Sequence, residues 1–245
     1  MKAWGITDIG LVRRENQDSY AICQEMPSGH LVCVVCDGMG GAAGGQVASS
    51  IGVDVYISEL KKILTAEMSP EQIREASSYV VSLANEAIRS AAGEQEEYQN
   101  MGTTLVAAIS CGSGMVVSNV GDSRAYHITP NGITRVTKDH SLVESMVDQG
   151  TITAEEARRH PNRNLITRAL SRDTDAQCDG YICTMDAGDF LLLCTDGLVD
   201  TVSDQEILFE VVHGAGPDDC LDRLLEISKQ HGAPDNVTAV LVQNL

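Results

Sequence analysis

Two runs of consecutive apolar residues stand out in this chain, and each is followed by an aspartate and a glycine. The first run covers residues 31–36 and leads to Asp37; the second covers 190–194 and leads, after one threonine, to Asp196. A short continuous apolar run is typical of a strand that is buried on both faces. A buried carboxylate is costly unless it is paired or binds a metal. The pattern therefore predicts two carboxylates that converge on a cation.

Other stretches of the chain predict a mixture of strands and helices. The hairpin signal Asn131-Gly132 joins two of the expected strands. The strands are expected at 2–10, 18–24, 31–36, 103–110, 115–120, 124–128, 133–136, 180–184, 189–195 and 237–243. Apolar residues recur at helical spacing over 46–64, and capping residues open a second helix at Ser69 that runs to about residue 91. Capping signals also predict two C-terminal helices, over 203–213 and from Pro217 to Gly232.

Residues 138 to about 175 break the strand pattern and form a long polar insert. Capping residues Ser141 and Thr153 each predict a short helix within it. Basic residues are concentrated there, although the protein as a whole is acidic. They are His140, Arg158, Arg159, His160, Arg163, Arg168 and Arg172. Two interpretations stay open: a functional basic surface, or charge balance at the protein surface, where ion pairs contribute little.

Composition and charge narrow the class of protein. The chain has 245 residues, is 43% hydrophobic and shows no internal repeat or linker, so we expect one domain. The 35 acidic and 17 basic residues give a formal charge of −18. Such a charge disfavours binding to nucleic acids and to anionic membranes. An anionic substrate would need a local positive centre, either a metal or an arginine.

The cysteines and the termini point to a reduced compartment. Neither a membrane-length apolar run nor a secretory signal is present, and most of the eight cysteines lie in apolar runs. Cys33 and Cys36 have the spacing of a zinc or redox pair. In a strand, however, that spacing directs the two side chains to opposite faces, which disfavours this alternative. We expect a cytoplasmic protein.

Four aspartates lie at the ends or starts of expected strands: Asp37, Asp122, Asp196 and Asp235. Their neighbours are Gly, Asn, Ser and Thr, so a site built from them would offer oxygen ligands, which suit Mg²⁺ or Mn²⁺. Calcium is disfavoured because no EF-hand loop is present. Any single Asp-Gly pair could be a plain turn, but four such aspartates favour a site with two divalent ions that acts at phosphorus.

Several short motifs are spread over nearly the whole chain. They are Arg13 with Asn16-Gln17-Asp18-Ser19, residues 35–41, Gly102-Thr103-Thr104, residues 121–126, Asp139-His140-Ser141, residues 195–198 and Asp235-Asn236-Val237-Thr238. Together, and in this order, they resemble the protein phosphatase 2C family, the metal-dependent serine/threonine phosphatases, in its compact bacterial form. The resemblance implies an α+β fold, a four-layer αββα sandwich of two antiparallel sheets flanked by helices, with the metals in a cleft at one edge. It also implies a single domain over 1–245 with a mobile flap within about 138–175.

The resemblance implies a ligand set for two metal ions per chain, Mn²⁺ or Mg²⁺. Asp37 would bridge the two ions, and the Gly38 carbonyl would bind one of them. Asp196 and Asp235 would complete the shell of the first ion, and Asp18 would act on the second, directly or through its waters.

A third ion and the substrate phosphate have implied sites as well. Asp122, together with Asp196, would hold the third ion described for bacterial members of the family. Arg13 would hold the substrate phosphate, a task that suits its planar fork. Asp37, Arg13 and Asp196 are thus the expected catalytic residues.

Two positions depart from the family pattern. Gln17 stands where some members have a glutamate, which removes one anionic contact to the second metal. Met39 stands where eukaryotic members have a histidine that is proposed as the general acid. Protonation of the leaving group would then fall to a metal-bound water or another group; His140 and His160 are candidates, although a structural role is favoured for both.

The function that the resemblance implies is hydrolysis of phosphoserine and phosphothreonine in proteins by a hydroxide that bridges the metals. The expected partners are phosphorylated proteins, including a cognate serine/threonine kinase, and we expect a monomer. One alternative keeps the fold but narrows the target to a single stress-pathway phosphoprotein. Another is a non-catalytic binding protein, which the intact set Asp37, Asp196 and Asp235 disfavours.

Overall fold

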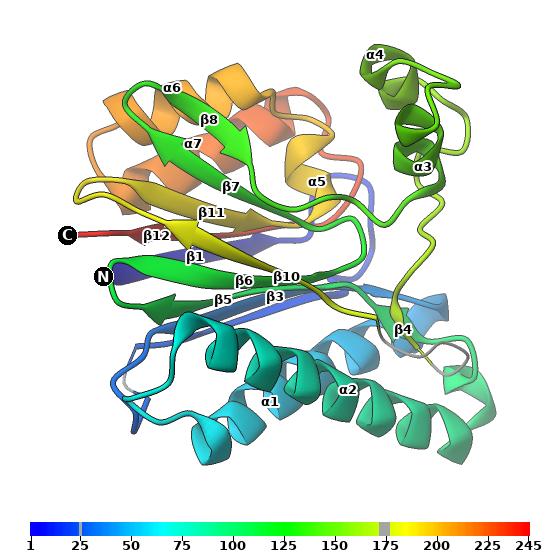
Figure 1. Ribbon diagram of the computed structural model, residues 1–245. Helices are drawn as coiled ribbons and strands as arrows, with labels where there is room; N and C mark the ends of the chain where they lie inside the picture. Colours follow the sequence, from blue (N-terminus) through cyan, green and yellow to red (C-terminus); the bar gives the residue numbers. More distant parts are fainter. Residues whose placement is uncertain (25, 172–176) are drawn as a thin grey trace.

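The computed structural model describes residues 1–24, 26–171 and 177–245, and it shows two antiparallel β-sheets packed face to face with helices on both outer sides (Figure 1). The strand order is β1-β12-β11-β7-β8 in the five-stranded sheet and β10-β6-β5-β3-β4-β9 in the seven-stranded sheet, where β2 pairs with β3. The predicted α+β sandwich of two antiparallel sheets flanked by helices is therefore confirmed.

The bounds of the strands follow the predicted ranges closely. The five-stranded sheet consists of β1 (Lys2–Asp8), β7 (Arg124–Thr129), β8 (Gly132–Arg135), β11 (Phe190–Cys194) and β12 (Val237–Gln243). The seven-stranded sheet consists of β2 (Asp18–Cys23), β3 (Val32–Met39), β4 (Gly102–Thr103), β5 (Leu105–Cys111), β6 (Gly114–Val120), β9 (Leu170–Ser171) and β10 (Asp179–Thr184).

The helices form the two outer layers and one projecting segment (Figure 1). The long helices α1 (Gly41–Ile63) and α2 (Pro70–Glu94) cover the seven-stranded sheet, and α6 (Asp204–His213) and α7 (Pro217–Gln230) cover the five-stranded one. Between α2 and β4 lies the short helix η1 (Glu96–Tyr98), and α5 (Asp196–Val199) directly follows β11. The two short helices α3 (Leu142–Asp148) and α4 (Ala154–Arg158) lie to one side of the sandwich.

Three apolar clusters stabilise these layers: one between the sheets and one under each pair of outer helices. Cys33 lies in the cluster between the sheets, whereas Cys36 lies in the cluster under α1 and α2. The two side chains thus point to opposite faces of β3, as the strand register predicts. All eight cysteines are free thiols. Within the described residues, no helix is long and apolar enough to cross a membrane.

The predicted bounds are wrong at two places beside the aspartates. The strand expected at 31–36 continues through Asp37 to Met39, because β4 adds backbone pairing to its last residues. The helix expected from Gln46 begins at Gly41. Glycine is a poor helix former, which hides this turn in the sequence. Here close packing of Gly44 and Gly45 against neighbouring segments requires residues without a side chain.

Four further short elements, β4, η1, β9 and α5, are not predicted as separate elements from the sequence. Each is at most four residues long, too short to show a periodicity of its own. Arg172 and the last residues of the expected flap range lie outside the described residues.

Candidate active site

The backbone of Asp37 is fixed from both sides by two threonines. The Asp37 carbonyl oxygen accepts hydrogen bonds from Thr103 Oγ1 at 2.8 Å and from the Thr104 N–H at 2.9 Å. The Asp37 N–H donates to Thr104 Oγ1 at 3.0 Å. These bonds explain the Gly102-Thr103-Thr104 motif: it holds Asp37 in place near the end of β3.

Gly38 lies where no other residue would fit. A Cβ at this position would lie 2.1 Å from the Gly45 carbonyl oxygen in α1 and 2.5 Å from the Gln17 carbonyl oxygen. The Gly38 N–H donates to the Gln17 carbonyl oxygen at 3.2 Å. The start of α1 can therefore pack directly on the strand end that carries Asp37.

Asp18 lies directly opposite Asp37 in the antiparallel pairing of β2 and β3. Its Oδ2 accepts a hydrogen bond from Thr195 Oγ1 at 3.0 Å, so it also contacts the segment that leads to Asp196. Burial raises the pKa of Asp18 to about 7, and the charges of Asp196 and Asp235 act in the same direction.

Asp196 comes from the other sheet, as the first residue of α5 after β11. The Thr195 N–H donates to the Thr238 carbonyl oxygen at 3.0 Å, which fixes the turn against β12. Burial raises the pKa of Asp196 to about 6, and the charges of Asp200 and Asp235 act in the same direction. Among the described residues, Asp196 Oδ1 is a buried side-chain oxygen with no hydrogen-bond partner.

Asp122 reaches the same region from the turn between β6 and β7. Gly121 makes this turn with φ +110°, and a Cβ on it would lie 2.6 Å from Cγ2 of Thr104, the residue that holds Asp37. Burial raises the pKa of Asp122 to about 8, and the charge of Asp196 raises it further.

The structure brings five of the predicted site aspartates close enough to interact electrostatically. The pKa of Asp37 is raised well above its usual value, first by burial and then by the charges of Asp196, Asp18, Asp122 and Asp235. Close carboxylates cannot all be ionised unless a cation is present, and neighbouring ones share protons.

Arg13 lies at the edge of this cluster. Its Nη2 is 2.5 Å from Asp235 Oδ2, and both side chains are partly exposed. This hydrogen bond raises the pKa of Arg13, and the charges of Asp37 and Asp196 raise it further. The guanidinium group is thus held by one aspartate of the cluster and lies within the field of two others.

The donor set of the cluster fits a hard divalent cation. The aspartate side chains and the Gly38 carbonyl are all oxygen donors, which Mg²⁺ and Mn²⁺ prefer. The orphaned Asp196 Oδ1 is a buried acceptor that a cation could satisfy. In the part of the chain that the structure describes, no three side chains of His, Cys, Asp or Glu already form a complete metal-binding group. Backbone oxygens and water would have to supply part of any coordination shell.

The sequence reasoning missed two residues that shape the site. Asn236 accepts a hydrogen bond from the Gln17 N–H at 2.9 Å and donates to the carbonyl oxygens of Ile9 and Glu15. It thereby connects the Asp235 turn to the loop that carries Arg13. The sequence does contain a signal for Asn236, because the residue lies in the motif Asp235-Asn236-Val237-Thr238. Asp200, one turn after Asp196, was not singled out; burial raises its pKa, and the charge of Asp235 acts in the same direction.

Gln17 and Met39, the two departures from the family pattern, have different surroundings. Gln17 Nε2 donates to the Gly41 carbonyl oxygen at 2.9 Å, so the amide contacts the first turn of α1. Met39 lines a cavity of about 270 Å³ together with Met101 and Arg168.

His140 is buried and both its ring nitrogens have neighbours within the protein. Nδ1 accepts a hydrogen bond from the Gly121 N–H at 3.1 Å, and Nε2 lies 3.2 Å from Asp179 Oδ2. His160 Nδ1 accepts from the Asn162 N–H at 3.1 Å. These contacts favour the structural role for both histidines.

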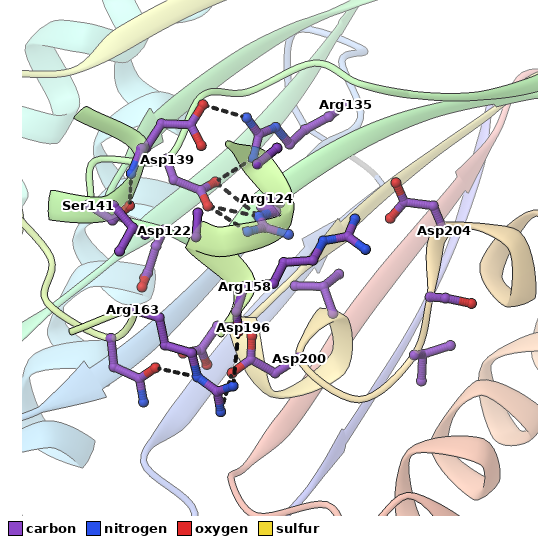
Figure 2. A pocket seen from close by; sticks show the side chains of 18 of the residues that line it. Asp122, Arg124, Arg135, Asp139, Ser141, Arg158, Arg163, Asp196, Asp200 and Asp204 are labelled. Atoms are coloured by element: carbon purple, nitrogen blue, oxygen red, sulfur yellow. Dashed lines mark hydrogen bonds and ion pairs between the residues drawn. The ribbon is translucent and has the colours of Figure 1, made fainter. Parts of the chain in front are cut away.

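A pocket of about 510 Å³ continues from Asp122 and Asp196 toward α3, α4 and α6 (Figure 2). Figure 2 shows Arg124 and Asp139 facing each other on one side of it and Arg163 beside Asp200 on the other. Two basic residues of the insert, Arg158 and Arg163, line this pocket beside the acidic site. Arg159 instead pairs with Glu155 at the surface and Arg168 pairs with Asp179. Arg172 is outside the described residues.

Comparisons with known proteins agree with this geometry. The sequence model of the protein phosphatase 2C family matches residues 13–242. The serine/threonine phosphatase stp of Listeria welshimeri is 34% identical over 97% of this chain and 93% of its own length. The serine/threonine protein phosphatase PstP of Mycobacterium tuberculosis is 36% identical over 96% of this chain and 43% of its own.

Solved structures are similar over the whole fold. A crystal structure of a bacterial serine phosphatase superposes with a TM-score of 0.92 at 36% identity, covering 100% of this chain and 98% of the other. The serine/threonine phosphatase Stp1 of Staphylococcus aureus gives a TM-score of 0.89 at 36% identity, with 99% and 94% covered. The chain belongs to the protein phosphatase 2C family.

Proposed function

We propose that this chain is a metal-dependent phosphatase that hydrolyses phosphoserine and phosphothreonine in proteins. The observation that carries the proposal is the convergence of Asp37 from one sheet and Asp196 from the other, with Arg13 at the edge of the same cluster. Oxygen ligands for divalent ions and a phosphate-binding arginine then lie side by side. The relatives named serine/threonine phosphatases support the same reaction.

The aspartate cluster would hold two Mn²⁺ or Mg²⁺ ions. Asp37, Asp196 and Asp235, with the Gly38 carbonyl, are the proposed ligands of the pair, and Asp18 would act on the second ion. When bound, such ions make water more acidic and neutralise charge on phosphoryl oxygens. They would also remove the repulsion that raises the carboxylate pKa values.

A third ion has a proposed site on the side of the insert. Asp122 and Asp196 would be its ligands, and Asp200 lies next to them at the rim of the same pocket. Burial raises the pKa of all three carboxyl groups, so each favours a cation that restores its charged form.

Arg13 would orient the substrate phosphate. A guanidinium group donates two parallel hydrogen bonds to phosphate oxygens and stays charged at any physiological pH. Asp235 holds one edge of the guanidinium group, so its other donors remain available for the phosphate. In this position Arg13 would stabilise the charge that develops on the phosphoryl oxygens.

The proton for the leaving alkoxide would come from water in the open site. Met39 has no proton to donate, and both ring nitrogens of His140 contact protein atoms. Asp37, Asp122 and Asp196 keep part of their surface exposed, so water has access to the cluster.

We further propose that the chain is one domain in which the described part of the insert, residues 138–171, acts as the flap beside the site. We propose a cytoplasmic monomer that acts on phosphorylated proteins, including a cognate kinase. The free, mostly buried cysteines support a reducing compartment.

The test is hydrolysis of a phosphothreonine peptide with and without added Mn²⁺. We expect a metal-dependent rate in the wild-type protein and its loss by roughly 10³-fold in Asp37→Asn, because one charge-stabilising group at the reacting centre is removed. The matched control is Asp54→Asn, an exposed aspartate on α1. Circular dichroism would check that both variants are folded.

Two outcomes would contradict the proposal. Undiminished turnover in Asp37→Asn would remove Asp37 from the catalytic machinery. Absence of any metal-dependent rate in the wild-type protein, with peptides or with an aryl phosphate, would favour a non-catalytic binding protein.

A further inference from the structure

The loop between β1 and β2 exposes two large apolar side chains immediately before Arg13. Leu11 is 60% exposed and Val12 is 67% exposed. Among the large hydrophobic residues that the structure describes, only the C-terminal Leu245 is more exposed. Single exposed apolar residues are common on protein surfaces. A pair beside the proposed phosphate-binding arginine is a more specific arrangement.

Backbone hydrogen bonds hold this loop in one shape. The Leu11 N–H donates to the Ala233 carbonyl oxygen at 2.9 Å. Asn236 Nδ2 donates to the carbonyl oxygens of Ile9 at 2.9 Å and of Glu15 at 3.0 Å, so one side chain joins both ends of the loop. The exposed side chains are therefore displayed from a fixed backbone, which lowers the entropy cost of binding.

Gly10 brings the loop close to the Asp235 turn. It has φ +76°, and a Cβ at this position would lie 2.2 Å from the Asp235 carbonyl oxygen. The same turn presents the carboxylate that binds Arg13. Leu11, Val12 and Arg13 thus follow one another on a loop that is packed against the aspartate cluster. In Figure 1 the blue loop after β1 lies at the same end of the sandwich as α5 and β4.

We propose that Leu11 and Val12 bind an apolar side chain of the phosphorylated protein substrate, within about two residues of the phosphoserine or phosphothreonine. The inference rests on the proposed function, because Arg13 sets the position of the phosphate. Two residues of extended chain span about 7 Å, so a substrate side chain within two residues of the phosphate stays near Arg13 and the residues next to it. The apolar contact would add selectivity for the sequence around the phosphorylated residue, which the phosphate itself cannot provide.

The charge of the protein favours this occupant over two others. A formal charge of −18 opposes docking on an anionic membrane surface, and it opposes close approach of a second copy of the chain. A phosphorylated segment is anionic as well, but Arg13 would hold its phosphate, and Arg14 adds positive charge beside the apolar pair.

The test compares two phosphothreonine peptides that differ only in the residues flanking the phosphothreonine, leucine in one and serine in the other. We expect the wild-type protein to have the higher kcat/KM with the leucine peptide. In the double variant Leu11→Gln, Val12→Thr, the ratio of kcat/KM for the leucine peptide to kcat/KM for the serine peptide is expected to fall by about tenfold. A fall of this size corresponds to the loss of about two buried methyl groups. Most of the change is expected in KM, because the contact involves a non-reacting part of the substrate.

An aryl phosphate has no flanking chain. Each peptide rate is therefore divided by the rate of aryl phosphate hydrolysis, which corrects for any change at the catalytic site itself. The matched control is Tyr79→Ser, which removes a side chain that is 56% exposed on α2, in the outer helix layer. This variant is expected to keep the wild-type ratio.

Two results would overturn the inference. One is an unchanged ratio in the double variant; the other is an equal fall for both peptides and the aryl phosphate, which would mean that the loop only supports Arg13. Failure of the proposed function would look different, since the wild-type protein would then hydrolyse neither peptide in a metal-dependent way.

Discussion

Two groups of buried carboxylates at the same end of the sandwich are compensated in different ways. Asp139 accepts hydrogen bonds from Arg124 Nε at 3.0 Å and from Arg124 Nη2 at 2.6 Å, and Arg135 Nη1 lies 3.5 Å away. Asp37 and Asp196 form no ion pair among the described residues, and the charge of Asp196 raises the pKa of Asp37. The protein thus supplies its own cations to Asp139 and none, among the described residues, to the pair Asp37 and Asp196.

In the first group the charges stabilise the fold; in the second group we propose that they bind metal ions. Arg135 also binds Glu144 of α3 at 2.7 Å, so the paired region fixes the insert to the five-stranded sheet. In the unpaired region the pKa values of the carboxyl groups are raised, which is the electrostatic strain that metal binding would relieve. The following predictions test this contrast.

The largest effect is expected at Asp139. The change Asp139→Asn would leave Arg124, whose side chain is 25% exposed, without its main counter-charge. Breaking a fully buried pair costs about 3–5 kcal/mol of unfolding free energy, so we expect a loss of about 3 kcal/mol here. Urea denaturation would measure the loss. Asp148→Asn is the control, because Asp148 pairs with Lys138 at the surface, where ion pairs contribute little to stability. Equal effects of the two substitutions would show that Asp139 is not buried in a stabilising pair.

The next effect is the pH dependence of stability in metal-free protein. Folding raises the pKa values to about 6 for Asp196, 7 for Asp18 and 8 for Asp122 from the ordinary value of 3.8. The native state therefore binds more protons than the unfolded chain in this range, and stability falls as the pH rises. Because these groups titrate together, we expect one continuous loss of stability between pH 5 and pH 8 rather than three separate steps.

Denaturation of the protein after treatment with a chelator, at pH 5 and at pH 8, measures this loss. Added Mg²⁺ or Mn²⁺ should restore stability at pH 8 and do little at pH 5, where protons compete for the same oxygens. Stability that rises with pH in the metal-free protein would contradict the assignment of an uncompensated cluster.

A smaller effect is expected at Arg13. Arg13→Lys keeps the charge but loses the fork that donates two hydrogen bonds to a phosphate, so kcat/KM for a phosphopeptide should fall about tenfold, or about 1.4 kcal/mol. Steady-state kinetics would show it. The control is Arg14→Lys at the neighbouring exposed position, with an expected change below about twofold. A similar fall in both variants would mean that Arg13 does not bind the substrate phosphate directly.

The smallest effect is expected at the contact between Arg163 and Asp200. Their charged atoms are 3.6 Å apart and both side chains are partly exposed. Arg163→Gln should change the unfolding free energy by less than about 1 kcal/mol, because surface ion pairs contribute little. A loss above 2 kcal/mol in urea denaturation would show that this contact fixes the insert to α5 as firmly as Asp139 fixes it to the sheet.

Much of the fold was predictable from local patterns. The apolar runs that lead to Asp37 and Asp196 correspond to β3 and β11, and the capping residues at Ser69, Thr153 and Ser203 form the predicted capping boxes. These features depend on neighbours in the sequence, since burial pattern and capping act over a few residues.

The candidate site was predictable only in part. The resemblance to a family named Asp37, Asp196 and their partners, but it did not show why Thr104 and Asn236 are needed. Both residues act by hydrogen bonds to segments distant in the chain. The glycines that begin α1 look unfavourable for a helix on propensity alone, and packing against Gly38 reverses that expectation.

The sequence by itself determined which segments become strands and that two of them lead to aspartates. This was possible because buried strand positions are occupied by apolar residues, so their pattern can be recognised in the sequence. Only the tertiary structure decided that Asp37 and Asp196 share one site while Asp139 is neutralised by Arg124. That choice depends on how two sheets pack and which side chains then meet, and the distance between charges after packing has no counterpart in their separation along the chain.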